Sequence, residues 1–181
     1  RRQRQMCIRD SRKTPDVPHQ PLTSETSITQ RINAEKIALF FEQGASADDL
    51  LQAYIESLEH VHEPSTEMQP GDDLALLAVY VTLAKSSSVE NLIQAAAIAS
   101  YACEKSARAY KLRLLLIRLL LRLGCLKLAV YHFDALELKA VQLDTMSHYL
   151  FDRNASFGGS HAADVGNHWA VSYTHLRAHE T

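Results

Sequence analysis

The stretch Lys111–Arg153 constrains the fold of this chain more than any other part of the sequence. It begins with a very apolar segment that Arg113, Arg118 and Arg122 interrupt every four or five residues, and this segment ends at Gly124. Two further segments with helical spacing of apolar residues follow. An apolar helix of this kind packs against neighbouring helices, and glycine is common directly after a helix. The stretch therefore predicts a scaffold of helical pairs, and it contains no plausible catalytic group.

The two ends of the chain differ from the rest. Residues 1–11 (RRQRQMCIRDS) and 170–181 (AVSYTHLRAHET) resemble translated sequencing-adapter DNA. The transposon end AGATGTGTATAAGAGACAG, read with one flanking base on each side, encodes QMCIRDS, and its reverse complement encodes AVSYTHL. Because one DNA word accounts for both ends, we expect both to be artefacts and exclude them from the fold prediction. We expect the remainder, 12–169, to be an internal piece of a longer chain.

Charge and composition exclude several function classes. The chain has a net charge of −2, and without the two ends it loses five basic and two acidic residues and becomes more acidic. This balance argues against general nucleic-acid binding, and we expect no DNA partner. The longest apolar run, Leu112–Leu123, contains arginines and is too short to cross a membrane. Cys103 and Cys125 lie in apolar helical patterns, which predicts reduced, buried thiols in a cytoplasmic protein.

The rest of the chain divides by composition into three parts. Residues 12–26 contain three prolines among polar residues and read as a linker, 27–159 read as a helical-repeat segment, and 160–169 read as the start of a further, truncated repeat. We expect Ser27, Ser46 and Ser88 to cap helices, with Asp49 completing a capping box. We also expect helices over about 72–85, 107–123, 126–136 and 144–155. The first helix is expected to bury Ile28, Ile32, Ile37, Phe40 and Phe41 and to end with Gly44 at C′.

The spacing of apolar residues predicts an all-α fold, an α-solenoid of antiparallel helix pairs. The best-formed pair is tetratricopeptide-like. Two substitutions, Ile117 and Leu136, depart from that repeat, because small residues are usual at their positions. The repeat-packing positions are filled here by Leu116, Leu120, Gly124, Leu126, Ala129 and Phe133.

Two parts of the sequence resemble one known family. The stretch 111–153 (KLRLLLIRLLLRLGCLKLAVYHFDALELKAVQLDTMSHYLFDR) resembles the auxiliary subunit of the N-terminal acetyltransferase B complex, and so does EMQPGDDLALLAVY at 67–80. In that family a helix with the pattern LLLIR…LG is followed by LDAK.IQ.DT. This chain has LLLIR at 114–118, LG at 123–124, LELK at 136–139 and VQLDT at 141–145.

The resemblance implies a non-catalytic scaffold. The family's auxiliary subunit is a superhelix of tetratricopeptide-like pairs that wraps around a small acetyltransferase and helps attach it to ribosomes. The resemblance implies that the catalytic partner, and not this chain, uses acetyl-CoA to acetylate nascent chains that begin Met-Asp, Met-Glu, Met-Asn or Met-Gln. We therefore expect no cofactor, no metal and no catalytic residue in this chain, and a cytoplasmic location.

Basic residues supply the main candidate for a binding surface. Arg108, Lys111, Arg118 and Arg122 lie close together in sequence, with Arg113 and Lys127 nearby. They predict either a patch for an anionic partner such as ribosomal RNA or a solvated face with arginines extended over an apolar helix.

Other polar residues have simpler interpretations. Asp72 and Asp73 stand at a helix start, where acidic groups interact favourably with the helix dipole. His60 and His62 point to different faces of one helix and do not predict a metal site. His132 and His148 are expected to be ordinary surface or interface residues.

Two other function classes remain open from the sequence. The first is a generic tetratricopeptide-type interaction adaptor. Such adaptors normally carry a two-carboxylate clamp of Lys, Asn and Arg on successive first helices, and the sequence alone assembles none. The second is a stand-alone helical enzyme, which would need a nucleophile, a base and an orienting group, and the sequence offers no such set.

Overall fold

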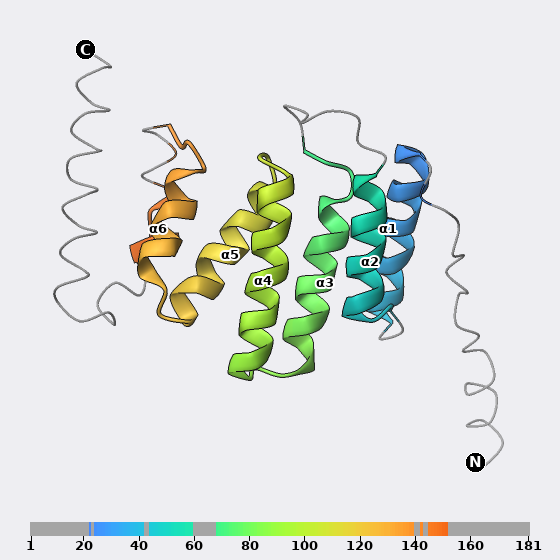
Figure 1. The fold of residues 1–181 in the computed structure, drawn as a ribbon, viewed down its shortest axis with the longest axis horizontal. Coiled ribbons are helices and arrows are strands. Elements are labelled where there is room, and N and C mark those ends of the chain that lie inside the picture. Colours follow the sequence, from blue (N-terminus) through green and yellow to red (C-terminus); the bar gives the residue numbers. More distant parts are fainter. Residues whose placement is uncertain are drawn as a thin grey trace, which may run out of the picture.

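A computed structural model describes residues 22, 24–41, 44–59, 68–139, 142 and 145–151. The predicted ends 1–11 and 170–181, the segment 160–169, most of the linker 12–26, and His60 and His62 lie outside the described residues. The described residues form helices and no strand. Consecutive helices pack as antiparallel pairs (Figure 1), so the all-α prediction is confirmed. The helices are α1 (Glu25–Phe40), α2 (Ala47–Leu58), α3 (Asp72–Lys85), α4 (Val89–Lys105), α5 (Tyr110–Arg122), α6 (Leu126–Asp134) and α8 (His148–Phe151).

Side-chain capping hydrogen bonds mark the starts of α1, α2 and α4. Ser46 caps α2 in a capping box with Asp49, and Ser88 caps α4, as predicted. The predicted cap Ser27 is wrong, because Ser24 caps α1 and Ser27 is the N3 partner in its capping box. The Ser24 hydroxyl accepts from the Ser27 N–H (3.3 Å), and the Ser27 hydroxyl accepts from the Ser24 N–H (3.1 Å). The sequence offers two serines one turn apart, and the reciprocal bonds select the earlier one.

The apolar face predicted for α1 is correct only in its first half. Ile28 and Ile32 are buried, whereas Ile37, Phe40 and Phe41 are exposed, Phe40 by 82%. The buried face continues through Glu35 and Ala38 instead. A charged residue can take an inner position there because the Glu35 carboxylate pairs with Arg31 (2.8 Å) and accepts from the Ala45 N–H (3.1 Å). The C-cap of α1 is Phe41. The prediction of Gly44 at C′ is therefore wrong, because Gly44 lies three residues after the C-cap.

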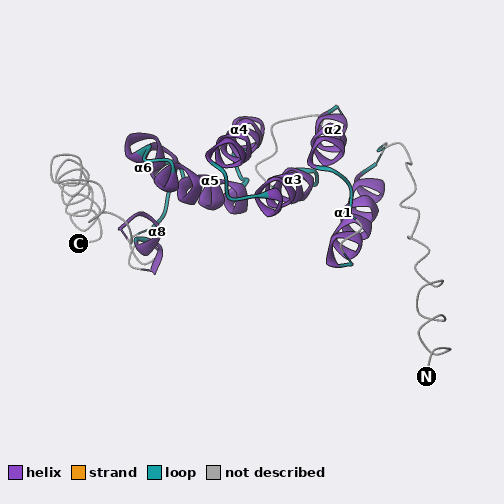
Figure 2. Ribbon diagram, turned by 90° about the horizontal axis from the view of Figure 1, so that it is seen from below, coloured by secondary structure: helices purple, strands orange, loops and turns teal. Residues whose placement is uncertain are grey.

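The helices form two layers. Figure 2 shows α2, α4 and α6 in one layer and α1, α3, α5 and α8 in the other, with α1 and α8 bending to the same side. The second layer therefore lines a concave face, and below we call it the concave layer. Its members α1, α3 and α5 are the first helices of successive pairs, which is the arrangement expected of a helical repeat.

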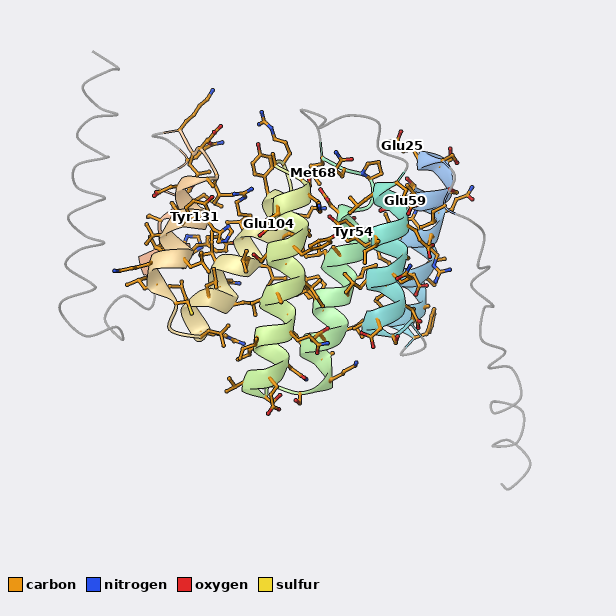
Figure 3. The ribbon with its side chains drawn as sticks, in the orientation of Figure 1. Glu25, Tyr54, Glu59, Met68, Glu104 and Tyr131 are labelled. Atoms are coloured by element: carbon orange, nitrogen blue, oxygen red, sulfur yellow. The ribbon has the colours of Figure 1, made fainter. Side chains whose placement is uncertain are left out.

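The core lies between the two layers. On α4 a run of buried alanines (Ala95, Ala96, Ala99 and Ala102) allows close approach to α3 and α5. Helix α3 is buried at Leu74, Leu77 and Val79, whereas Tyr80 is half exposed. Figure 3 shows Tyr54 of α2 among the helices. Its ring is fully buried and meets that of Tyr101 edge-on at 6.4 Å between centroids.

The pair α5–α6 contains the residues predicted to pack the repeat. Gly124 forms the turn with φ of 78°, a backbone conformation that side chains disfavour. Helix α5 starts at Tyr110, later than predicted, and α6 ends at Asp134, earlier than predicted. The other five predicted packing residues are all buried between the layers: Leu116, Leu120, Leu126, Ala129 and Phe133.

Candidate functional site

Among the described residues, potential metal ligands lie apart from one another and the two cysteines differ in burial. Within the described part of the chain, no group of three or more His, Cys, Asp or Glu side chains could hold a metal ion. Cys103 is buried, and burial raises the pKa of its thiol to about 11, which disfavours the nucleophilic thiolate. The prediction of a buried thiol is wrong for Cys125, which is exposed because it caps α6 directly after Gly124 rather than lying inside a helix.

The basic residues that are clustered in sequence are separated in the structure. Arg113 is buried and donates to the Ala107 carbonyl (3.4 Å), so it belongs to neither a binding patch nor a solvated face. Arg108 is exposed and donates to the Tyr110 hydroxyl (2.6 Å). Arg113 also affects His132, which is buried rather than on the surface. Burial, followed by the Arg113 charge, lowers the pKa of His132 and favours its neutral form.

Lys111 is neutralised by a carboxylate of the chain itself. Asp73, in the first turn of α3, lies 3.3 Å from the Lys111 ammonium of α5 and 2.6 Å from the Lys36 ammonium of α1. Burial alone would raise the pKa of Asp73, but the hydrogen bond and charge of Lys36, together with Lys111, lower it overall. We call Lys36, Asp73 and Lys111 the charge bridge. It joins three successive helices of the concave layer.

The charge bridge bears on the adaptor hypothesis. Lys36 on α1 and Lys111 on α5 both belong to first helices, as the lysines and arginines of a carboxylate clamp would, but the first helix α3 lies between them. The carboxylate between them is Asp73, so the chain itself supplies the group that a peptide ligand would have to bring.

Asp72, next to Asp73, has a different environment. Its side chain is buried and accepts from the Gln69 N–H (3.2 Å) and from the Ser106 hydroxyl (2.7 Å), which ties the start of α3 to the end of α4. Burial raises the pKa of Asp72 in spite of these two hydrogen bonds. The two acidic residues therefore both begin α3, as the helix-dipole argument predicts, but only Asp73 belongs to a surface network.

Arg118 and Arg122 line a pocket of about 380 Å³ at the other end of the concave layer. Its lining comes from α3, α5 and α8, and it includes neither Arg108 nor Lys111. The polar lining residues are Arg118, Arg122, His148 and Tyr149. The apolar lining residues are Leu83, Leu115, Leu119 and Leu121.

Aromatic contacts fix the cationic side of this pocket. The Arg118 guanidinium lies 4.9 Å from the centre of the Tyr149 ring, within the range of a cation–π interaction. The His148 ring lies 4.4 Å from the Tyr149 ring, and its Nδ1 donates to the Thr145 carbonyl at 2.7 Å. Across the residues that the structure describes, no carboxylate lies within salt-bridge distance of Arg118 or Arg122.

Sequence reasoning found the two arginines of the pocket but missed most of its other walls. The sequence analysis predicts an ordinary surface or interface residue at His148, which lines the pocket. Tyr149 was not singled out. These residues lie far apart in sequence, and no local pattern links them. The exposed aromatic Tyr131 of α6, labelled in Figure 3, was likewise not anticipated.

Comparison with known protein families gives a match over most of the chain. A family model described as the non-catalytic subunit of the N-acetyltransferase B complex matches residues 7–177. The matched range extends into both ends that resemble adapter DNA, and the interpretation of those ends stays a sequence-based prediction. No curated protein and no solved structure matches the chain. The helices that the structure describes include none that is long and apolar enough to span a bilayer.

Proposed function

The chain belongs to the family of non-catalytic subunits of the N-acetyltransferase B complex, and from this premise we propose that it is the scaffold that holds the catalytic acetyltransferase. The family match over residues 7–177 is the observation that carries the proposal. The resemblance of the stretch 111–153 to the same family, noted from the sequence, is in accord with it.

The arrangement of helices supports a scaffold role. Stacked helix pairs expose one long continuous surface, and a curved layer of first helices suits the enclosure of a smaller partner. In the described residues, buried polar groups such as Asp72 and Arg113 serve the packing of helices, and the thiol of Cys103 is buried. The chemistry of acetyl transfer is therefore assigned to the partner, which would bind acetyl-CoA.

The finer parts of the proposal concern substrates and location. We propose that the complex acetylates nascent chains beginning Met-Asp, Met-Glu, Met-Asn or Met-Gln, that it works in the cytoplasm, and that this chain aids its attachment to ribosomes. The anionic-partner surface predicted from the sequence narrows in this proposal to Arg118 and Arg122, because Lys111 is held by Asp73 and Arg108 lies outside the pocket.

The test uses the native full-length chain, purified with its partners from its own cells. The eluate is assayed for acetyl transfer to peptides that begin Met-Glu and to matched peptides that begin Ser. We expect acetylation of the Met-Glu peptides well above that of the Ser peptides, and no transfer by the chain purified alone.

Two outcomes would contradict the proposal. Transfer by the isolated chain would make it an enzyme. Co-purification with other proteins, but without an acetyltransferase, would favour the generic adaptor. The charge bridge counts against the adaptor, because a peptide carboxylate would have to displace Asp73 from Lys36 and Lys111.

A further inference from the structure

We propose that the pocket between α3, α5 and α8 receives a short segment of the catalytic partner in which a carboxylate side chain lies next to a large apolar one. This inference rests on the proposed function, because it assigns the segment to the acetyltransferase. It names a docking point and the chemistry of its occupant, which the family match does not do.

The charge of the pocket selects an anionic group. Arg118 and Arg122 lie one helical turn apart and line the same pocket, and like charges at this spacing repel each other. Among the described residues no acidic side chain relieves this repulsion. A guanidinium presents two parallel N–H groups that match a carboxylate. The Tyr149 ring holds the Arg118 guanidinium in place, so less side-chain freedom is lost on binding.

The leucines of the pocket select an apolar neighbour for that carboxylate. Leu83, Leu115, Leu119 and Leu121 line it, and Leu119 and Leu121 are buried parts of the core. A pocket of about 380 Å³ has the size of a small ligand site. An acidic side chain beside a leucine, isoleucine or phenylalanine on one extended segment would satisfy both the arginines and the leucines.

A polypeptide segment fits the pocket better than RNA does. Phosphate binding needs positive charge over a wide surface, whereas this chain carries a net charge of −2 and Asp73 already neutralises Lys111 nearby on α5. An RNA backbone would also leave the leucine lining without an apolar partner. RNA binding at this place is therefore an alternative that the test must distinguish.

The test uses the full-length chain and short overlapping synthetic peptides that cover the catalytic subunit. Binding of each labelled peptide is measured by fluorescence anisotropy. We expect the tightest peptides to contain Asp or Glu beside a large apolar residue. Replacement of that acid by its amide should weaken binding by about tenfold or more, because a hydrogen bond to a charged group is lost.

Variants of the chain locate the binding. Arg118→Gln and Arg122→Gln should each weaken the acidic peptide by about tenfold, and should leave its amide counterpart unchanged. Arg108→Gln is the matched control, since Arg108 is an exposed arginine outside the pocket, and it should have no effect. Both pocket arginines are exposed, so neither substitution should unfold the chain, and circular dichroism would check this.

Several results would overturn the inference. The amide peptide could bind as well as the acidic one, Arg108→Gln could weaken binding as much as Arg118→Gln, or labelled oligouridylate could bind more tightly than the peptides and lose affinity in Arg118→Gln. A complex that forms and acetylates Met-Glu peptides, but shows no peptide that depends on Arg118, would overturn this inference alone. Absence of the acetyltransferase from the purified complex would instead overturn the proposed function.

Discussion

The two ends of the concave layer differ in whether their basic side chains are paired. One end is the charge bridge, near the starts of α3 and α5, and the other is the pocket, near the ends of the same helices. At the charge bridge, Lys36 and Lys111 are both paired with Asp73. At the other end Arg118 and Arg122 face a pocket whose described lining contains no carboxylate. Lys111 and Arg118 are two turns apart on the same helix, so the difference does not come from α5.

The difference comes from what α3 places beside each end of α5. The first turn of α3 brings Asp73 to Lys111, and its last part brings Leu83 to the two arginines. A basic residue is therefore available for a partner only where its neighbouring helix offers no acid. The sequence of α5 alone does not distinguish Lys111 from Arg118 and Arg122 as binding residues. The fold distinguishes them, because it pairs only Lys111 with an acid of α3.

The largest expected effect comes from destabilising α5, the helix that contributes residues to both the charge bridge and the pocket. Leu116 is buried in α5, the helix that carries Lys111 as well as the pocket arginines. Leu116→Ala should lower the free energy of unfolding by about 2–5 kcal/mol, because it removes buried apolar groups and leaves a cavity. Urea unfolding measures this. Leu128→Ala, at an exposed position of α6, is the control, and an equal loss in both would show that α5 is not central to the core.

The next largest effect is expected for a substitution in the turn after α5, close to the pocket end of the concave layer. Gly124 has φ of 78°, and a Cβ placed there meets no atom within 4 Å, so the cost of Gly124→Ala is confined to the backbone. We expect a loss of about 1–2 kcal/mol in the free energy of unfolding. Gly124→Asn should lose less, since asparagine tolerates this conformation better. Equal losses for alanine and asparagine would argue against a strained turn.

A smaller effect opens the charge bridge. Asp73→Asn should cost up to about 1 kcal/mol near neutral pH, since the three groups are partly exposed. The folded-state pKa of Asp73 is lowered, so its contribution is present above the unfolded-state pKa and is lost as the pH falls through the folded-state pKa. Urea unfolding of both proteins between about pH 7 and pH 3 should therefore show the difference shrinking in acid.

Asp72→Asn is a control for which we expect the opposite pH dependence of the stability difference. The folded-state pKa of Asp72 is raised, so the folded protein binds this proton more tightly than the unfolded chain does. The stability of the native protein relative to Asp72→Asn should therefore fall as the pH rises through that raised pKa. Parallel pH profiles for the two variants would contradict the environments described for these neighbouring acids.

The smallest effect contrasts single charges at the two ends. Lys111→Gln removes an attraction to Asp73 and should lower stability slightly, by a few tenths of a kcal/mol. Arg122→Gln relieves repulsion from Arg118 and should leave stability unchanged or raise it by about 0.2–0.5 kcal/mol. Both differences should diminish in high salt. A loss of stability in Arg122→Gln as large as that in Lys111→Gln would show that Arg122 has a stabilising partner.

Local sequence signals were sufficient for much of the fold. Helix α3 runs from Asp72 to Lys85 as predicted, and Ser46, Ser88 and Gly124 mark boundaries as predicted. Each of these signals acts within one or two turns of the chain, through capping hydrogen bonds or the freedom of glycine. The all-α class followed from the spacing of apolar residues for the same reason.

Tertiary contacts decided what the sequence analysis missed. Glu35 is inside because Arg31 and the Ala45 N–H satisfy its carboxylate, and the apolar residues Phe40 and Phe41 are outside. The periodicity of α1 alone does not reveal this.

Tertiary contacts also determine the candidate site. The partners Lys36 and Ser106 are separated from Asp73 and Asp72 by 37 and 34 residues, so the sequence gives no local sign of either contact. Arg118 and Arg122 could be named from sequence, but the pocket they share with Tyr149 could not.

The charge bridge also has an evolutionary consequence. A change of one base converts an aspartate codon into an asparagine codon. At position 73 that change would keep the size of the side chain and release Lys36 and Lys111 from their ion pairs. The charge-bridge end of the concave layer would then present free ammonium groups from α1 and α5, the first and third of the first helices. One mutational step therefore separates a scaffold with a single anion-accepting end from a scaffold with two.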